Sequence, residues 1–239
     1  MKRFVLGVDP GKINDPTGVV ALRVDDGQAA HASWLRTSRG PRRYVDEWGK
    51  PLPVEEEPSP RLTFDVVHIE RRPLEESYPA MVRYVRGLLT RPELAPEGEP
   101  PVCVLDCTGV GQAVADLARE AGIEPLVLVS ITGGVLPHFE AGYWRTPKAD
   151  LVTAVVVKLQ QGELKIAKEL KFAEALKQEL LGFRVTTSAS GRDSYGAGEE
   201  WREAQHDDLV LALAVATWWA ARRWTGPSLD PNAYARLQC

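Results

Sequence analysis

Acidic residues stand at the ends of apolar runs at three places in this chain. They are Asp9 after residues 4–8, Asp106 after residues 102–105, and the pair Asp207 and Asp208 before residues 209–219. Burying an unpaired carboxylate is expensive, and no Lys or Arg adjoins these positions in the sequence. If the acids converge in space, we expect a divalent cation to supply the counter-charge.

A cluster of carboxylates without a soft ligand indicates one kind of chemistry. Mg²⁺ and Mn²⁺ prefer hard oxygen ligands and retain several waters. Two such ions about 3.5 to 4 Å apart can stabilise an in-line displacement at phosphorus, one activating the attacking water and the other the leaving oxygen. The acids therefore favour a phosphoryl-transfer site that holds two Mg²⁺ or Mn²⁺ ions.

The elements that position these acids are predicted from hydrophobic periodicity and turn residues. Residues 3–9, residues 17–24 and a third strand ending near residue 35 read as an antiparallel meander, followed by a strand at 63–70 and a helix at 78–89. Strands at 102–106 and 126–131 then alternate with a helix at 111–121 and a helix that has Thr146 as N-cap and Pro147 at its first position. The remaining predictions are a helix at 169–181, an edge strand at 183–188, a loop or hairpin at 189–200, and a helix at 206–223.

This order of elements is typical of a ribonuclease H-like α/β fold, a mixed sheet of an antiparallel meander and parallel strands that is flanked by helices. In that fold the strands at 3–9 and 102–106 lie side by side, which would bring Asp9 and Asp106 within metal-bridging distance. We expect a single domain over residues 1–239. The prolines and charges of residues 37–61 indicate a loop or hairpin insertion.

Five motifs follow one another over nearly the whole chain. They are Gly7-Val8-Asp9-Pro10-Gly11, Asp15-Pro16-Thr17-Gly18, Asp106-Cys107-Thr108-Gly109-Val110-Gly111, Lys148, and His206-Asp207-Asp208 before an Ala/Leu-rich helix. This ordered set resembles the nuclease domain of the large terminase subunit of tailed bacteriophages. The resemblance implies that Asp9, Asp106 and either Asp207 or Asp208 bind the metal, and it alone favours Asp208.

The same resemblance implies an activity and partners. The activity would be metal-dependent endonucleolytic cutting of double-stranded DNA during viral genome packaging. Candidate partners would be a separate packaging ATPase, a portal and a small terminase subunit. A complete large subunit carries the ATPase itself, and this sequence has no Gly-x-x-x-x-Gly-Lys-Ser/Thr phosphate loop. We therefore expect either an excised nuclease domain or a separately encoded relative.

Each acid also has a simpler structural interpretation. Asp9 could cap the turn that follows it, and Asp106 could cap the next helix. Asp207 and Asp208 could provide the negative charge that suits a helix N-terminus. Helical periodicity does not choose between these two, because both have apolar residues on their own face of the helix. Asp15 is either an auxiliary acid or, as we favour, a turn residue.

Basic residues suggest where DNA would bind. Arg39, Arg42 and Arg43 belong to the densest basic and aromatic segment, which suits phosphate contacts or is simply a solvated charge run. Lys148 could contact a phosphate, tune the acidic cluster, or be an ordinary surface lysine. His206 could act as an acid or base beside the leaving oxygen, although a solvated histidine is the more common case.

Glu70 stands at another predicted strand end. It could join the carboxylate set, although we favour pairing with Arg71 or Arg72, which follow it.

Composition limits the protein class. The net charge of -4 argues against a surface that coats nucleic acid everywhere, and three cysteines are too few for a disulfide framework. No apolar run reaches the roughly 20 residues that cross a bilayer. We therefore expect a soluble protein without a membrane partner, located in the cytoplasm, which is the host cytoplasm if a phage encodes it.

Other functions use related folds. A RuvC-type junction resolvase would cut branched DNA, and an ASKHA-type nucleotide-binding protein would bind ATP. A non-catalytic DNA-binding or packaging module of the same fold would bind without cutting. Cleavage of linear, supercoiled and four-way-junction DNA separates these alternatives.

Overall fold

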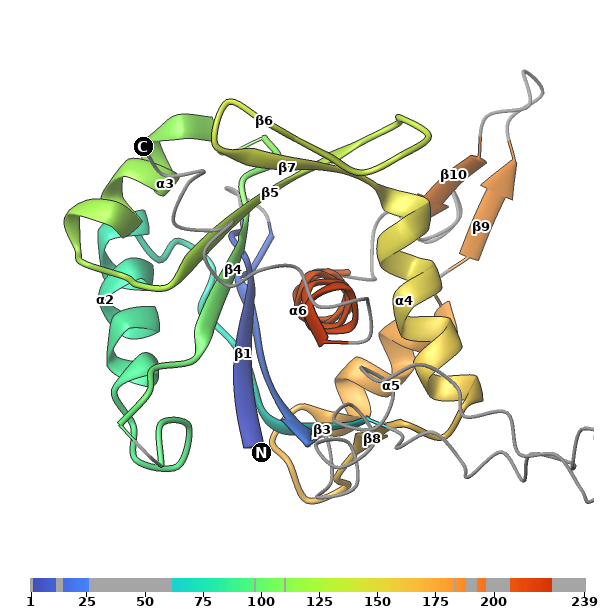
Figure 1. The fold of residues 1–239 in the computed structure, drawn as a ribbon, viewed down its shortest axis with the longest axis horizontal. Coiled ribbons are helices and arrows are strands. Elements are labelled where there is room, and N and C mark those ends of the chain that lie inside the picture. Colours follow the sequence, from blue (N-terminus) through green and yellow to red (C-terminus); the bar gives the residue numbers. More distant parts are fainter. Residues whose placement is uncertain are drawn as a thin grey trace, which may run out of the picture.

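A mixed eight-stranded sheet forms the centre of the protein (Figure 1). The computed structural model describes residues 2–11, 15–25, 62–96, 98–109, 111–182, 184–187, 193–196 and 207–224. The strands of the sheet are β1 (Lys2–Asp9), β2 (Gly18–Asp25), β3 (Thr63–Arg71), β4 (Val102–Asp106), β5 (Leu126–Thr132), β6 (His138–Glu140), β7 (Tyr143–Pro147) and β8 (Leu164–Ile166). Their order is β6-β7-β5-β4-β1-β2-β3-β8.

Helices cover both faces of this sheet (Figure 1). The helices are α2 (Tyr78–Leu89), α3 (Gly111–Glu120), α4 (Lys148–Gln160), α5 (Ala173–Gly182) and α6 (Asp208–Trp224). Helix α6 packs directly on the sheet with α4 and α5 behind it, whereas α2 and α3 lie on the opposite face. Strands β9 (Arg184–Thr187) and β10 (Asp193–Gly196) form a separate antiparallel pair.

The pairing of β1 confirms the predicted topology. Strand β1 pairs with β2 in antiparallel and with β4 in parallel orientation, and β5 continues the parallel half of the sheet beside β4. The predicted mixed α/β sheet is therefore present, and β1 and β4 are neighbours as the fold requires.

The third strand of the meander was predicted in the wrong place. Strand β3, at residues 63–71, is the strand that pairs with β2, so the segment read as a separate later strand completes the meander. The strand expected to end near residue 35 lies outside the described residues, as does the insertion expected at 37–61. That the whole chain forms one domain stays a prediction.

The predicted N-cap at Thr146 is also wrong. Thr146 and Pro147 are the last residues of β7, which the sequence did not reveal, and they pair with Ile131 and Thr132 of β5. Proline has no backbone N–H group to donate, so it is tolerated at the end of a strand, immediately before the first turn of α4. The short strands β6 and β8 were likewise missed, because three residues carry too little periodicity to be recognised.

Side-chain alternation divides the core into two parts. Val5 of β1 and Val104 of β4 face α6, whereas Leu6 and Leu105 face α2 and α3. Gly7 lies on the α6 face, where an added Cβ would stand 2.9 Å from Ala216 Cβ. The missing side chain lets α6 approach the sheet closely.

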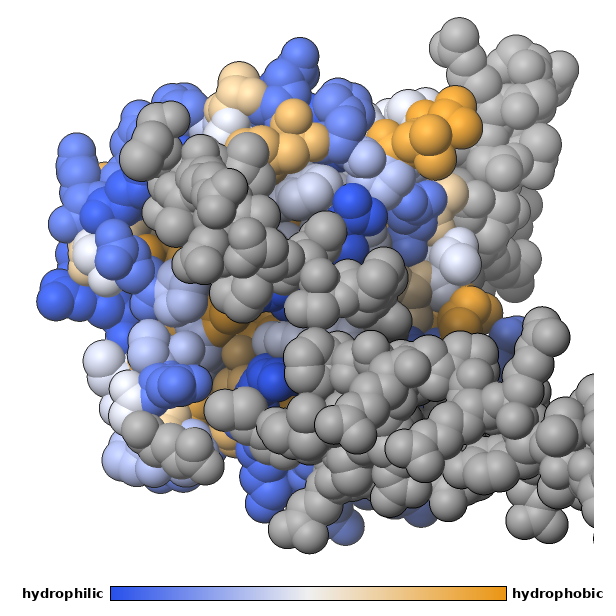
Figure 2. Space-filling model, viewed as in Figure 1, coloured by the Kyte–Doolittle hydropathy of each residue, from blue (hydrophilic) through white to orange (hydrophobic). Residues whose placement is uncertain are grey.

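Exposed large apolar side chains occur in several elements. Val135 and Leu136, in the loop between β5 and β6, are strongly exposed, as is Leu181 of α5, whereas Phe139 of β6 and Val156 of α4 are partly exposed. Figure 2 shows several apolar patches amid hydrophilic surface. None of the described helices has the length and apolar character needed to span a membrane.

Candidate metal centre

A lateral row of residues crosses the sheet on the face covered by α6. Asp9 pairs with Gly18 of β2, and Gly18 pairs with Arg71 of β3. Asp106 follows Leu105, which is the partner of Val8, so Asp9 and Asp106 end neighbouring parallel strands at the same level. Because side chains alternate along a strand, both carboxylates share the α6 face with Gly7 and Val104.

Gly18 makes room for the third acid. A Cβ on Gly18 would stand 2.5 Å from the carbonyl carbon of Asp208 and 3.0 Å from the nitrogen of Leu209. The first turn of α6 therefore rests on the glycine between Asp9 and Arg71. In this way the small residue in β2 places Asp208, distant in sequence, beside the acids of β1 and β4.

These acids line one cavity of about 290 Å³. Its lining residues are Asp9, Pro10, Gly11, Asp15, Pro16, Asp106, Thr108, Ile131, Lys148, Asp207, Asp208 and Leu211. Among the described residues, the lining of this cavity therefore contains five carboxylates and one ammonium group, that of Lys148. The predicted convergence of Asp9, Asp106, Asp207 and Asp208 is present in the structure, whereas their role as metal ligands stays a prediction.

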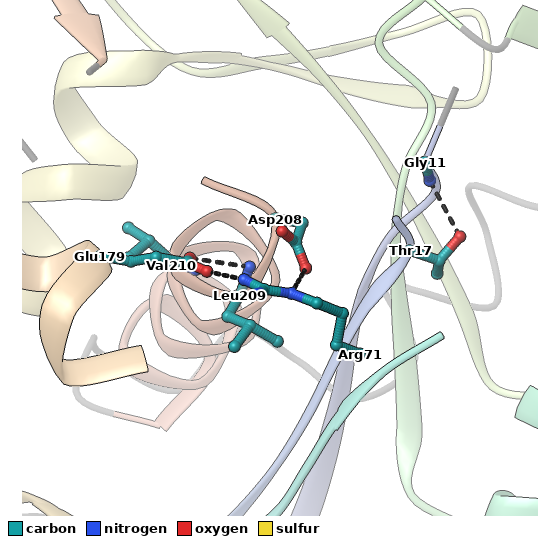
Figure 3. A network of polar contacts seen from close by, with 7 residues as sticks. All are labelled: Gly11, Thr17, Arg71, Glu179, Asp208, Leu209 and Val210. Atoms are coloured by element: carbon teal, nitrogen blue, oxygen red, sulfur yellow. Dashed lines mark hydrogen bonds and ion pairs between the residues drawn. The ribbon is translucent and has the colours of Figure 1, made fainter. Parts of the chain in front are cut away.

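Gly11, after β1, lies beside the residues that precede β2. It donates its N–H to Oγ1 of Thr17 at 2.9 Å (Figure 3). A Cβ on Gly11 would stand 2.5 Å from the carbonyl carbon of Pro16, so a larger residue would push these segments apart. This packing brings Asp15 to the rim of the cavity, where it lies beside the other acids.

The surroundings of Asp9 in the cavity disfavour its charged form. Burial raises its pKa well above the ordinary value, and the negative charges of Asp106, Asp207 and Asp208 raise it further. The ammonium group of Lys148 acts in the opposite direction but is the smallest effect. A neighbouring cation would relieve this accumulation of charge.

Asp106 is buried, and its side chain stabilises the turn before α3, whereas the sequence suggested a cap on the helix itself. Its Oδ1 accepts a hydrogen bond from the N–H of Thr108 at 2.7 Å. Oγ1 of Thr108 in turn accepts from the N–H of Ile131 at 2.6 Å. Gly109 follows with a φ of 78°, a left-handed conformation that glycine adopts at little cost. Asp106 thus orders the turn into α3 while its side chain lines the cavity.

The two neighbouring acids of α6 have different environments. Asp208 is 3% exposed, and its Oδ2 accepts a hydrogen bond from Nε of Arg71 at 3.0 Å. Asp207 is more exposed, and its Oδ2 lies 3.7 Å from Nζ of Lys148. Burial therefore distinguishes the two acids where periodicity did not.

The expectation that a cation alone supplies the counter-charge needs correction. Arg71 and Lys148 do not adjoin the acids in sequence, yet the fold brings Arg71 to Asp208 and Lys148 to Asp207. Sheet pairing and helix placement supply these contacts, which sequence proximity cannot reveal.

Glu179 of α5 belongs to the same polar network, although the sequence analysis did not identify it. Its Oε2 accepts hydrogen bonds from the backbone N–H groups of Leu209 at 3.1 Å and Val210 at 3.0 Å (Figure 3). Its Oε1 forms an ion pair with Nη2 of Arg71. Burial and the Asp208 carboxylate raise the pKa of Glu179 to about 8, whereas the Val210 N–H and Arg71 act to lower it.

Glu70 forms an ion pair, but with a residue other than the expected Arg71 or Arg72. Oε1 of Glu70 lies 2.9 Å from Nζ of Lys171. Arg71 turns to the α6 side, and Arg72 pairs with Glu76 and lies over the ring of Tyr84. Arg71 and Glu70 are neighbours in β3, so alternation along the strand directs their side chains to opposite faces of the sheet.

The donors in the cavity suit a hard divalent cation. All five acids offer carboxylate oxygens, the ligands that Mg²⁺ and Mn²⁺ prefer, and the raised pKa of Asp9 reflects its burial and the neighbouring carboxylates. Within the ranges described above, no three Asp, Glu, His or Cys side chains are grouped as the ligands of one ion. Asp106 and Asp208 instead accept hydrogen bonds from Thr108 and Arg71.

Four other predicted residues cannot be placed. His206, Arg39, Arg42 and Arg43 lie outside the described residues. Lys148, predicted as a DNA contact, begins α4 at the cavity, and its contact with DNA stays a prediction.

Solved structures share this arrangement of elements. The large terminase nuclease of the thermophilic phage G20c superposes with a TM-score of 0.54 at 18% identity, covering 90% of this chain and 81% of that one. The chain has a ribonuclease H-like α/β fold. The nuclease domain of the large terminase subunit gp2 of bacterial virus Sf6 matches with a TM-score of 0.54 at 16% identity, covering 90% of this chain and 87% of that one.

A K428A mutant of the same Sf6 nuclease domain, solved with manganese, is also similar to this chain. It matches with a TM-score of 0.52 at 15% identity, covering 90% of this chain and 88% of that one. No protein-family model matches the sequence, and no curated protein matches it.

Proposed function

We propose that this chain is a metal-dependent endonuclease that cuts double-stranded DNA, as in viral genome packaging. The observation that carries the proposal is the convergence of Asp9, Asp106, Asp207 and Asp208 on one cavity. The similarity of the fold to terminase nuclease domains supports the same reaction class.

Four carboxylates would hold two Mg²⁺ or Mn²⁺ ions. Asp9 lies between Asp106 on β4 and Asp208 above Gly18, so it would be the central ligand. Asp106 and Asp208 would be ligands beside it, with Asp207 as a further ligand at the more exposed edge. When bound, the ions would activate the attacking water and stabilise the leaving oxygen.

The protein supplies the orientation of the substrate. The ammonium group of Lys148 stands at the cavity rim, where it can contact a phosphate and limit repulsion between DNA and the acids. Arg39, Arg42 and Arg43 are proposed to contact the DNA backbone farther away. Such contacts carry no base information, so we expect little sequence preference.

Cleavage assays with variants test this function. Wild-type protein should nick supercoiled DNA and cut linear DNA with Mn²⁺ or Mg²⁺, and should lose activity with EDTA. Asp9→Asn should abolish cleavage. Asp116→Asn is the matched control, since Asp116 is an exposed acid paired with Arg119 on α3 and should not affect the rate.

The substrates distinguish the alternatives. Exclusive cutting of four-way junctions would favour a RuvC-type resolvase. DNA binding without cleavage under any divalent ion would favour a non-catalytic packaging module. Either result would contradict the proposed reaction, as would undiminished cleavage by Asp9→Asn.

A further inference from the structure

Arg71 joins two carboxylates that belong to different parts of the chain. Its Nε donates to Oδ2 of Asp208 at 3.0 Å, and its Nη2 pairs with Oε1 of Glu179. Both acids are almost fully buried, whereas the Arg71 side chain is 23% exposed. A planar guanidinium can bind two partners at fixed angles, so Arg71 fixes the orientation of the Asp208 carboxylate.

Glu179 binds the first turn of α6 as well as Arg71. Its Oε2 caps the backbone N–H groups of Leu209 and Val210, which belong to the first turn of α6 (Figure 3). The same carboxylate therefore holds both the helix that carries Asp208 and the arginine that orients it. A cap supplied by another helix ties the position of α6 to that of α5.

Asp208 contacts Arg71 and lines the cavity with the same side chain. Its Oδ2 binds Arg71, so in this proposal a cation in the cavity would bind to Oδ1. Arg71 lies two strands from Asp9, with Gly18 between them. Asp208 thus stands between the acid cluster on one side and Arg71 on the other.

We propose that Arg71 and Glu179 form a positioning pair that holds Asp208 as a ligand through one oxygen. The inference rests on the proposed function, since it assigns Asp208 to a bound divalent ion. Neither residue is proposed to touch the substrate. Partners that orient metal ligands typically contribute about 10- to 100-fold to metal affinity or activity.

Two variants separate geometry from charge. Arg71→Lys keeps the positive charge but cannot hold both acids with the two nitrogens of a planar fork. Above the pKa of Glu179, which is about 8, Glu179→Gln keeps an oxygen that can accept from Leu209 and Val210 but removes the charge that holds Arg71. We expect each variant to weaken Mn²⁺ binding, measured at such a pH by calorimetry without DNA, by about 10-fold or more.

Matched controls come from the neighbouring pairs. Arg72→Lys alters the next residue of the chain, which pairs with Glu76, and Glu70→Gln alters an acid that pairs with Lys171. Both controls should bind Mn²⁺ as the wild type does. Thermal unfolding of each variant without metal identifies any change that arises from stability alone.

The double variant tests whether the two residues act as one unit. If they do, Arg71→Lys combined with Glu179→Gln should weaken Mn²⁺ binding no more than the stronger single change. Wild-type affinity in Arg71→Lys, or effects that multiply in the double variant, would overturn this inference alone. A wild-type protein that neither binds Mn²⁺ nor cuts DNA would overturn the proposed function as well.

Discussion

Replacing Gly18 by alanine should impair catalysis without altering any charged group. The added Cβ would stand 2.5 Å from the carbonyl carbon of Asp208, whereas ordinary van der Waals contact begins at 3.4 Å. The atoms it meets are backbone, so the start of α6 must move. We estimate a displacement of about 1 Å, which at a reacting centre costs on the order of 100-fold in rate.

The same collision has a modest cost in stability. Overpacking by one methyl group costs about 1–3 kcal/mol. For a chain of this size that lowers the midpoint of thermal unfolding by roughly 2–12 °C. Initial cleavage rates of supercoiled DNA with Mn²⁺, measured well below that midpoint, isolate the effect on geometry.

Two changes in α2 serve as controls. Leu88→Ala removes a fully buried side chain far from the cavity and should cost about 2–5 kcal/mol in stability while leaving the rate near that of the wild type. Gly87→Ala adds a Cβ that meets nothing within 4 Å and should change neither the rate nor the metal affinity. A wild-type rate in Gly18→Ala would refute the inference that Asp208 must rest on Gly18 to act.

The remaining predictions concern charge in the cavity. Since the pKa of Asp9 is raised, its contribution to stability is present below the ordinary carboxyl pKa and is lost as pH rises through the raised value. Without metal, Asp9→Asn should therefore melt at a higher temperature than the wild type, by a margin that grows as pH rises above the ordinary carboxyl pKa of 3.8; a constant margin would contradict the charge clustering. Mn²⁺ binding should tighten over the same range because the ligands must lose protons, which calorimetry at several pH values measures. Lys148→Met should weaken DNA binding equally for all sequences and reduce the salt dependence by about one counterion, measured by anisotropy at several salt concentrations; an unchanged slope would remove Lys148 from the DNA contact.

The part of the site that rests on strand order could be predicted from the sequence. Apolar runs ending in Asp9 and Asp106 locate two strands, and the meander followed by alternating elements makes them neighbours. Both acids fall on one face because each lies two residues beyond a residue that faces α6. Local pattern and topology are sufficient for this pair.

The part that rests on packing between distant elements could not be predicted. Arg71 is 137 residues from Asp208 and 108 from Glu179, and nothing local links them. Glu179 lies among charged residues that read as a solvated face. The sequence held one signal, because Glu179 follows Ala173 and Leu176 at three-residue spacing. In the structure these three residues form the buried face of α5. An acid at an apolar position of a helix indicates a buried partner.

The choice between Asp207 and Asp208 shows the same limit. Their helical faces are equally apolar, so periodicity gives no answer. Burial against Gly18 and the contact with Arg71 distinguish Asp208, and both depend on how α6 meets the sheet.

Anomalous diffraction from crystals soaked in Mn²⁺ tests the central claim most directly. We expect two peaks in the cavity, with oxygens of Asp9, Asp106 and Asp208 as protein ligands, and no peaks there in crystals of Asp9→Asn soaked in the same way. Peaks that avoid these three acids, or a cavity without bound Mn²⁺ at concentrations that saturate cleavage, would contradict the account.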